Sequence, residues 1–208
     1  MNISEIKKNQ LQVAFEGKVA VLDVETLAQN PHATIGAIGV VIVDVVKLQA
    51  VDEFYCRIDL AQGRLRDDDT MAFWERQKIE SPAAYQEMFG NAGRLFLADA
   101  LEALSTFLGR HFDKVMVVEI MGNGSDFDNV VLTDAYQQWS VSLPWHFRGN
   151  QSLRTAVWMG RVLLGIDPKY QLPFEGIHHH ALHDARHEAA YLIAILKAFR
   201  LQLAGGES

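Results

Sequence analysis

The stretch KVAVLDVE, Lys18–Glu25, decides the fold of this chain. It is an apolar run that ends in acidic residues, which is the pattern of a buried β-strand. Two more stretches rich in β-branched and apolar residues follow closely, TIGAIGVVIVDVV at Thr34–Val46 and VDEFYCRIDL at Val51–Leu60. Because the three predicted strands are close in sequence, they favour an antiparallel meander.

The rest of the chain carries helical patterns with one further strand between them. Leucines recur at helical spacing from Leu97 to Leu108, and Gly165 is placed to close another helix. The expected elements after the meander are two short helices in Asp67–Phe89, the first capped by Asp68 or Asp69 and the second begun by Ser81-Pro82, a helix in Ala92–Phe112, a strand at Lys114–Met121, and helices at Asp126–Trp139, Ser152–Gly165 and Ala181–Leu203. Strands followed by helices that alternate with strands predict a mixed sheet with helices packed on it.

Length and composition predict a single domain. The 208 residues are enough for one substantial core, and we find no internal repeat or composition break. We expect an N-terminal extension at residues 1–17, one domain at 18–204 and a flexible tail at 205–208. The N-terminus lacks the apolar core of a signal peptide, and no run approaches the ~20 apolar residues of a membrane span. We therefore expect a cytoplasmic protein that does not enter membranes.

Charge and cysteine content narrow the function. The net charge of −7 argues against a broad basic surface for nucleic acid. It leaves open a nucleic-acid enzyme whose local positive charge comes from bound metal ions. Cys56 is the single cysteine, which excludes an intramolecular disulfide and a cysteine-based zinc cluster.

The two acids that close the first strand are the first candidate site residues. Asp23 and Glu25 point to the same face, because side chains alternate along a strand. Unpaired charges are expensive to bury, and two carboxylates on one face suit a divalent cation with oxygen ligands. The alternative is a strand end that simply emerges into solvent.

A second acidic element follows the fourth predicted strand. In GNGSDFDNVVL, Gly122–Leu132, Asp126 and Asp128 flank Phe127 at the start of a predicted helix. Helix capping and the helix dipole favour aspartate at such a position, so capping alone accounts for one of the two.

The stretch GIHHHALHDARHEAA, Gly176–Ala190, adds histidines to the acids. If the last helix begins near Ala181, four of its side chains share one face: Asp184, His187, Glu188 and Tyr191. A solvent-exposed helix face would explain His187 and Glu188 just as well as a functional site would. Three consecutive histidines, His178–His180, cannot all point at one metal. A carboxylate-rich site prefers Mg²⁺ or Mn²⁺, which leaves histidine as a proton carrier.

Together these residues resemble a known family. Three separated motifs have the order and spacing of the DEDDh exonucleases, which are ribonuclease-H-like 3′→5′ exonucleases: Asp23-Val24-Glu25-Thr26, Phe127-Asp128 and His179-x4-Asp184. The stretches DVETLAQNPHATIGAIGVV, FWERQ and GNGSDFDNVVLTDAY also resemble the bacterial and phage single-domain exoribonucleases, a group that includes exodeoxyribonuclease VIII-like sequences. The resemblance covers about residues 19–200.

The resemblance implies a fold and a set of roles. The fold would be α/β, a ribonuclease-H-like five-stranded mixed sheet with its first three strands antiparallel and helices around it. Two divalent cations, Mg²⁺ or Mn²⁺, would be held by four acids: Asp23, Glu25, Asp128 and Asp184. His179 would accept the proton of the attacking water. His178 and His180 lie outside the motif, and Asp126 is interpreted as a helix cap.

The resemblance also implies a substrate. The reaction would be hydrolysis of single-stranded RNA or DNA from the 3′ end, with release of nucleoside 5′-monophosphates. The implied contacts to the 3′ end are Thr26, Leu27 and Phe127. Three other aromatic residues are candidates for stacking on bases, although core packing is the favoured interpretation of each: Trp74, Trp145 and Phe147. A homodimer is implied as well, and the choice between RNA and DNA stays open.

Two other classes of function compete with the exonuclease. One is a catalytically silent ribonuclease-H-like module that binds nucleic acid or protein, for which a missing acid or histidine would be the usual mark. The other is a zinc hydrolase centred on His178–His183, which would leave the carboxylates unexplained. Since no motif residue is missing, the sequence favours the enzyme.

Overall fold

The computed structural model describes residues 16–205. The expected N-terminal extension therefore lies almost entirely outside the described residues, as do residues 206–208 of the expected tail. The last helix continues to Gly205, where we expected that tail to begin. Within the described range, no helix is both long enough and apolar enough to cross a membrane.

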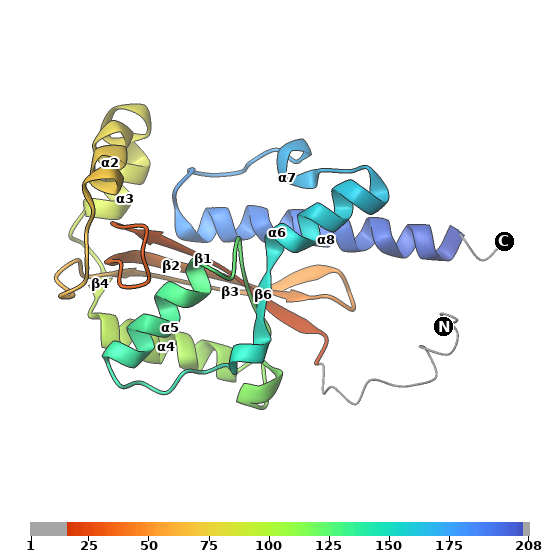
Figure 1. Cartoon of the computed structure of the whole chain (residues 1–208), viewed down its shortest axis with the longest axis horizontal. Coiled ribbons are helices and arrows are strands. Elements are labelled where there is room, and N and C mark those ends of the chain that lie inside the picture. Colours follow the sequence, from red (N-terminus) through yellow and green to blue (C-terminus); the bar gives the residue numbers. More distant parts are fainter. Residues whose placement is uncertain (1–15, 206–208) are drawn as a thin grey trace.

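A mixed sheet forms the centre of the molecule (Figure 1). Its six strands, in the spatial order β4-β3-β2-β1-β5-β6, are β1 Lys18–Thr26, β2 Ile35–Asp44, β3 Gln49–Ile58, β4 Arg94–Leu95, β5 Ile120–Gly122 and β6 Asn150–Ser152. The first three pair antiparallel, as the sequence predicted, and β5 adds to β1 in parallel. Within residues 16–205 the sheet has six strands rather than the expected five, and the short β4 and β6 form its two edges in parallel pairing.

The fourth strand is much shorter than its sequence pattern predicted. We expected a strand over Lys114–Met121, but only Ile120–Gly122 pairs with β1, and Val115–Val117 forms a 3₁₀ turn. The register explains the difference. Ala20 lies opposite Ile120, and β1 begins only two residues earlier, at Lys18. Residues before Val118 therefore have no strand beside them to complete a ladder of hydrogen bonds.

Helices cover both faces of the sheet (Figure 1). They are α2 Asp68–Glu80, α3 Pro82–Phe89, α4 Leu97–Gly109, α5 Asp128–Gln138, α6 Leu153–Met159, α7 Pro168–Gln171 and α8 Ala181–Gly205. α4 and α5 pack on one face and α6 and α8 on the other, whereas α2 and α3 form a separate small cluster at one end. These layers bury two apolar cores, one on each side of β1.

Alternation along β1 assigns its two acids to one layer. Ala20, Leu22 and Val24 belong to the core shared with α4 and α5, whereas Val19 and Val21 belong to the core shared with α6 and α8. Because the side chains alternate, Asp23 and Glu25 continue the row that faces α8.

Local capping chemistry at α2, α3 and α6 follows the sequence with one correction. The N-cap of α2 is Asp67, whose carboxylate accepts a 2.7 Å hydrogen bond from the amide of Thr70, so the prediction of Asp68 or Asp69 was wrong by one or two residues. Both of those aspartates lie in the first turn, where the helix dipole favours them. Pro82 begins α3 as predicted. Gly165 closes its helix with φ of 66°, after α6 has passed into a π-helical turn.

The start of α8 rests directly on the backbone of β2. A Cβ atom placed on Gly39 would overlap the backbone of Ala181 and Leu182. Glycine at this position therefore lets α8 approach the sheet closely enough to bring Asp184, three residues into the helix, over β1.

We predict that Gly39→Ala will disturb the site as well as the fold. Pushing α8 off the sheet is expected to lower stability by about 1–3 kcal/mol, as overpacking of a core does. It should also reduce nuclease activity by roughly 10–100-fold, because a displacement of ~1 Å suffices for such a loss. Thermal melting and initial rates test this, with Gly109→Ala as control, since a Cβ at Gly109 meets no atom within 4 Å. Full activity in a destabilised Gly39→Ala protein would contradict the positioning role.

Candidate active site

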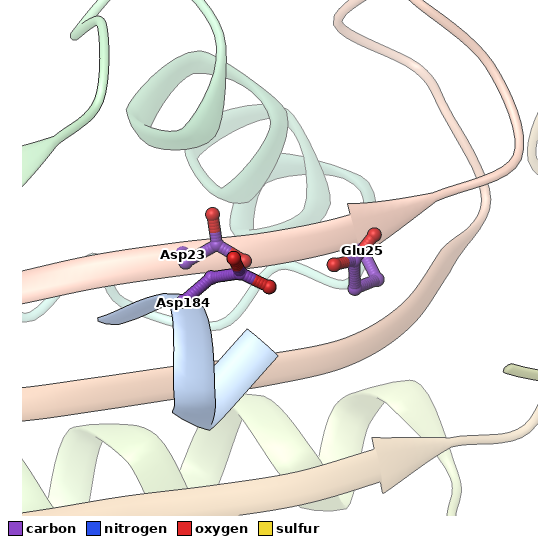
Figure 2. Close-up of side chains that lie close together, drawn as sticks. All are labelled: Asp23, Glu25 and Asp184. Atoms are coloured by element: carbon purple, nitrogen blue, oxygen red, sulfur yellow. The ribbon is translucent and has the colours of Figure 1, made fainter. Parts of the chain in front are cut away.

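Three carboxylates from two elements converge on one point. One ligand oxygen each of Asp23, Glu25 and Asp184 lies within 4.8 Å of the others. Figure 2 shows Asp23 and Glu25 on β1 and Asp184 approaching them from α8. Period-2 spacing predicted that Asp23 and Glu25 share a face, and the family resemblance implied that Asp184 joins them.

Asp128 reaches β1 from the other layer. It is the first residue of α5 and only 5% exposed, and its carboxylate accepts a hydrogen bond of 3.4 Å from the amide of Val24. Asp128 is not one of the three acids whose oxygens lie within 4.8 Å of one another, so it lies beside that group rather than in it. The structure thus places Asp128 beside Asp23 and Glu25, and its charge acts on both.

The expected cap residue Asp126 does not cap α5. The N-cap position is Phe127, and no side chain caps that end. Asp126 is instead largely exposed and lies 3.8 Å from the guanidinium of Arg154. The prediction of a cap at Asp126 was therefore wrong, because the helix begins at Asp128, too late for Asp126 to reach its first amides.

The acids raise one another's pKa values. Asp23 and Glu25 are partly buried, and burial is the main cause that raises both of their pKa values. The charge of Glu25 adds to the effect on Asp23, and that of Asp184 adds to the effect on Glu25, whose pKa rises to about 8. Burial likewise raises the pKa of Asp128 to about 7, against the hydrogen bond from Val24.

This donor set fits a divalent cation. The Oδ2 atom of Asp23 is buried and finds no hydrogen-bond donor among residues 16–205. Clustered carboxylates that lack a partner must take up protons or a cation. Oxygen-only ligands suit hard cations such as Mg²⁺ and Mn²⁺. Asp23, Glu25 and Asp184 are the residues that would hold such an ion, with Asp128 beside them.

His179 lies at the edge of this cluster in an unusual backbone conformation. Its φ is 62°, in the left-handed region, and its ring meets the edge of Phe73 at 5.0 Å between centroids. Its ring also lines a small hollow together with Glu25. Burial lowers the pKa of His179, and the charge of Asp184 opposes this shift. A neutral ring beside the acids is able to accept a proton.

The neighbouring histidines are used for packing. His178 stacks on Phe174 with 3.8 Å between ring centroids, and His180 stacks between Tyr55 and His183. The amide of His180 donates a 3.0 Å hydrogen bond to the carboxylate of Asp184, which fixes that ligand at the start of α8. Among the described residues, the one group of side chains that could hold a metal contains no histidine, which argues against a zinc hydrolase.

A cavity of about 220 Å³ opens on the Glu25 side of the acids. Thr26, Phe127 and Phe73 line it together with Glu25, so two of the three predicted substrate contacts are brought together. Leu27 is fully buried in the cluster with Trp74 and does not line the cavity. The Thr26 hydroxyl donates to the carbonyl of Ala28, at 2.9 Å.

Phe73 is a cavity residue that sequence reasoning missed. The motif FWERQ drew attention to Trp74, which is buried as expected and donates a hydrogen bond from Nε1 to the carbonyl of Thr26. Its neighbour Phe73 lines the cavity together with Trp74, and the two rings meet edge to face with 5.3 Å between their centroids. Trp145 is also buried, as expected, whereas Phe147 is 67% exposed.

A larger cavity of about 410 Å³ opens on the Asp184 side. Its lining includes Asp184, Glu188, Tyr191 and Lys169. Glu188 is only 4% exposed, so the exposed helical face considered for it does not exist in the structure. The helical spacing that placed Glu188 on the face of Asp184 was the signal that could have identified it.

The fold and this set of acids define the class of protein. Solved structures of nucleases share the fold. The nuclease domain of 3′hExo, a DEDDh family member bound to rAMP, aligns with a TM-score of 0.62 at 13% identity, covering 88% of this chain and 94% of that one. Cell-death related nuclease 4 (CRN-4) gives 0.64 at 14% identity, covering 87% and 64%. Exonuclease I of E. coli, in complex with a dT13 oligonucleotide, gives 0.65 at 13% identity, covering 91% and 43%. The chain thus spans less than two thirds of the latter two proteins.

The sequence itself identifies the family. Residues 18–196 match the Rv2179c-like 3′-5′ exoribonuclease domain, and the chain belongs to that family. No curated protein sequence matches the chain. Family membership confirms the predicted 3′→5′ exonuclease class, and the fold shared with a DEDDh nuclease confirms the predicted fold, whereas the likeness to the exodeoxyribonuclease VIII group stays a prediction.

Proposed function

We propose that this exonuclease shortens single-stranded RNA or DNA from the 3′ end with the help of Mg²⁺ or Mn²⁺ and releases nucleoside 5′-monophosphates. The observation that carries the proposal is the convergence of Asp23, Glu25 and Asp184 within 4.8 Å. Membership of an exoribonuclease family makes RNA the first substrate to test.

The two cavities suggest how single-stranded nucleic acid would lie across the acidic side chains. Glu25 lines the smaller cavity and Asp184 the larger one, so the acids stand between them. We infer that the terminal nucleotide occupies the smaller cavity against Phe73 and Phe127, since aromatic rings stack on bases. Thr26 borders the same cavity and would approach the terminal sugar. The preceding nucleotides would then leave through the larger cavity.

The chain's own residues divide the chemistry between them. When bound, the divalent cations supply the positive charge that stabilises the attacking and leaving oxygens of an in-line displacement. Asp23, Glu25, Asp128 and Asp184 would hold and orient these cations. His179 accepts the proton of the attacking water, which its lowered pKa leaves it free to do at neutral pH. The terminal nucleotide departs with the phosphate on its 5′ oxygen.

We predict that His179→Ala will reduce the rate without reducing metal binding. Loss of a general base is expected to slow cleavage by roughly 10²–10⁴-fold. In the unchanged protein, kcat/KM should fall as the pH drops through the pKa of His179, which lies below its ordinary 6.5, because a protonated ring cannot accept the proton. His179→Ala should lose this acid limb at saturating Mn²⁺. His146→Ala is the control, and a limb that persists in His179→Ala would contradict the assignment.

A gel assay tests the function directly. Single-stranded RNA and DNA of the same sequence, each labelled at the 5′ end, are incubated with the protein in Mg²⁺, in Mn²⁺ and in chelator. A metal-dependent ladder that shortens from the 3′ end supports the proposal, and the faster ladder identifies the preferred sugar. If neither polymer is cut although Mn²⁺ binds, the catalytically silent binding module becomes the better explanation.

We also propose that the protein acts in the cytoplasm as a homodimer. Resemblance to small exonucleases suggested the dimer. Three large apolar side chains on α6 and the π-helical turn after it, at about 60% exposure, offer a surface for self-association: Trp158, Val162 and Leu163. Light scattering of the purified protein tests the dimer.

A further inference from the structure

Glu188 is a buried acid that the exonuclease motif does not account for. It lies on α8 one turn after Asp184 and is 4% exposed. Its Oε2 atom has no hydrogen-bond partner within residues 16–205. A buried carboxylate without a partner is strongly destabilising unless something neutralises it.

The surroundings of Glu188 contain other oxygen atoms in the same condition. The hydroxyl of Tyr191, which is 1% exposed, and the side-chain oxygen of Asn123 are both buried without a hydrogen-bond partner in the described part of the chain. Both residues line the larger cavity together with Glu188. Unpaired oxygens around one cavity are suited to a hard cation and its coordinated water.

The charges around Glu188 are mostly negative. Burial raises its pKa most, and the charges of Asp128 and Asp184 raise it further. Lys169 and a hydrogen bond from the side chain of Asn123, both of which line the same cavity, act in the opposite direction, but the net effect is still a raised pKa. Lys169 alone therefore does not compensate the acids that meet here.

Glu188 and Glu25 both lie near Asp23 but line different cavities. Glu25 lines the smaller cavity and Glu188 the larger, and the charges of both act on Asp23. Glu188 is not among the three acids whose oxygens lie within 4.8 Å of one another. It therefore marks a second position beside Asp23, separate from the one defined by Glu25 and Asp184.

We propose that Glu188 is a fifth acidic ligand of the site and holds a second divalent cation between Asp23 and the larger cavity. This inference rests on the proposed two-cation function and adds a residue to it. With Glu188 in place, the second cation binds before nucleic acid arrives, because the protein supplies a carboxylate where a substrate phosphate would otherwise be needed.

Metal titration of the full chain without nucleic acid tests the proposal. Calorimetry with MnCl₂ should show two Mn²⁺ per chain. In Glu188→Gln the second Mn²⁺ should bind at least about 10-fold more weakly while the first keeps its affinity. The electron paramagnetic resonance signal of a coupled Mn²⁺ pair should be lost in parallel. Glu102→Gln is the matched control, since Glu102 is exposed on α4.

Two further measurements keep the proposal open to refutation. Glu188→Gln should melt at or above the temperature of the unchanged protein in chelator, because it removes a buried charge at constant size. Should that variant fail to fold, Glu188→Asp is the alternative, because it keeps the charge but shortens the side chain. It should weaken the binding of the second Mn²⁺ and leave the binding of the first unchanged. One Mn²⁺ in the unchanged protein, or equal affinities in the variants, would overturn the proposal. Absence of RNA cleavage would refute the proposed function but not this result, which needs no cleavage.

Discussion

Replacing Asp23 with asparagine is expected to reduce 3′-end shortening by roughly 10³-fold or more, because Asp23 is the acid around which the others gather. Its pKa is raised by burial and by the charges of Glu25, Glu188, Asp128 and Asp184, in that order. Asparagine keeps the size of the side chain and removes the charge. The variant should therefore fold, and in chelator it should melt at a higher temperature than the unchanged protein.

The combination of lost activity and gained stability distinguishes a site residue from a structural one. Initial rates on 5′-labelled RNA and melting curves in chelator measure the two effects on the same preparations. Asp126→Asn is the control, since Asp126 is a largely exposed aspartate near the site that is not part of the acid cluster. If Asp23→Asn still shortened RNA at a comparable rate, Asp23 would not be a ligand of the catalytic cations.

The second large effect concerns pH and metal together. Without divalent cations, stability should fall as the pH rises from about 4.5 to about 8, the interval between the ordinary and the folded-state pKa of Glu25. In this interval the folded protein binds more protons than the unfolded chain, so a rising pH favours unfolding. Asp128, whose pKa rises from 3.8 to about 7, contributes in the same direction. The change should be on the order of a few kcal/mol, since one pKa unit corresponds to ~1.4 kcal/mol.

Divalent cations should reverse this dependence. A cation binds the ionised carboxylates in competition with protons, so the stabilisation by Mn²⁺ should grow as the pH rises. Melting curves over this pH range, in chelator and in Mn²⁺, measure both trends. Glu25→Gln should flatten the slope in chelator. A protein that becomes more stable with rising pH in chelator would show that the acids do not repel one another in the folded state.

The sequence predicted those site residues whose direction is fixed by rigid local geometry. Alternation along a strand leaves little freedom, so Asp23 and Glu25 could be assigned to one face before the structure was known, and the two cores beside β1 agree with this. That Asp184 joins them was implied by the family resemblance rather than by local spacing. Asp126 was misassigned because capping depends on the first helical residue, which sequence locates only to within a few positions.

Packing between residues far apart in the chain determined two features that the sequence alone did not predict, the burial of Glu188 and the length of β5. Helical spacing placed Glu188 on the face of Asp184, but whether that face is covered depends on how closely α8 approaches the sheet, and the approach depends on Gly39 in β2. The length of β5 likewise depends on where β1 begins, at Lys18. Both features join residues far apart in the chain, and no local pattern records them.

The left-handed backbone of His179 ties the base to the ligand beside it. A non-glycine residue in this conformation stores about 1 kcal/mol of strain. The peptide that joins His179 to His180 carries the amide that donates to the carboxylate of Asp184. A change in the backbone at His179 would therefore move the base and disturb the ligand together. Turnover and metal occupancy should thus be linked properties, and changes to the backbone of the short loop before α8 should alter both.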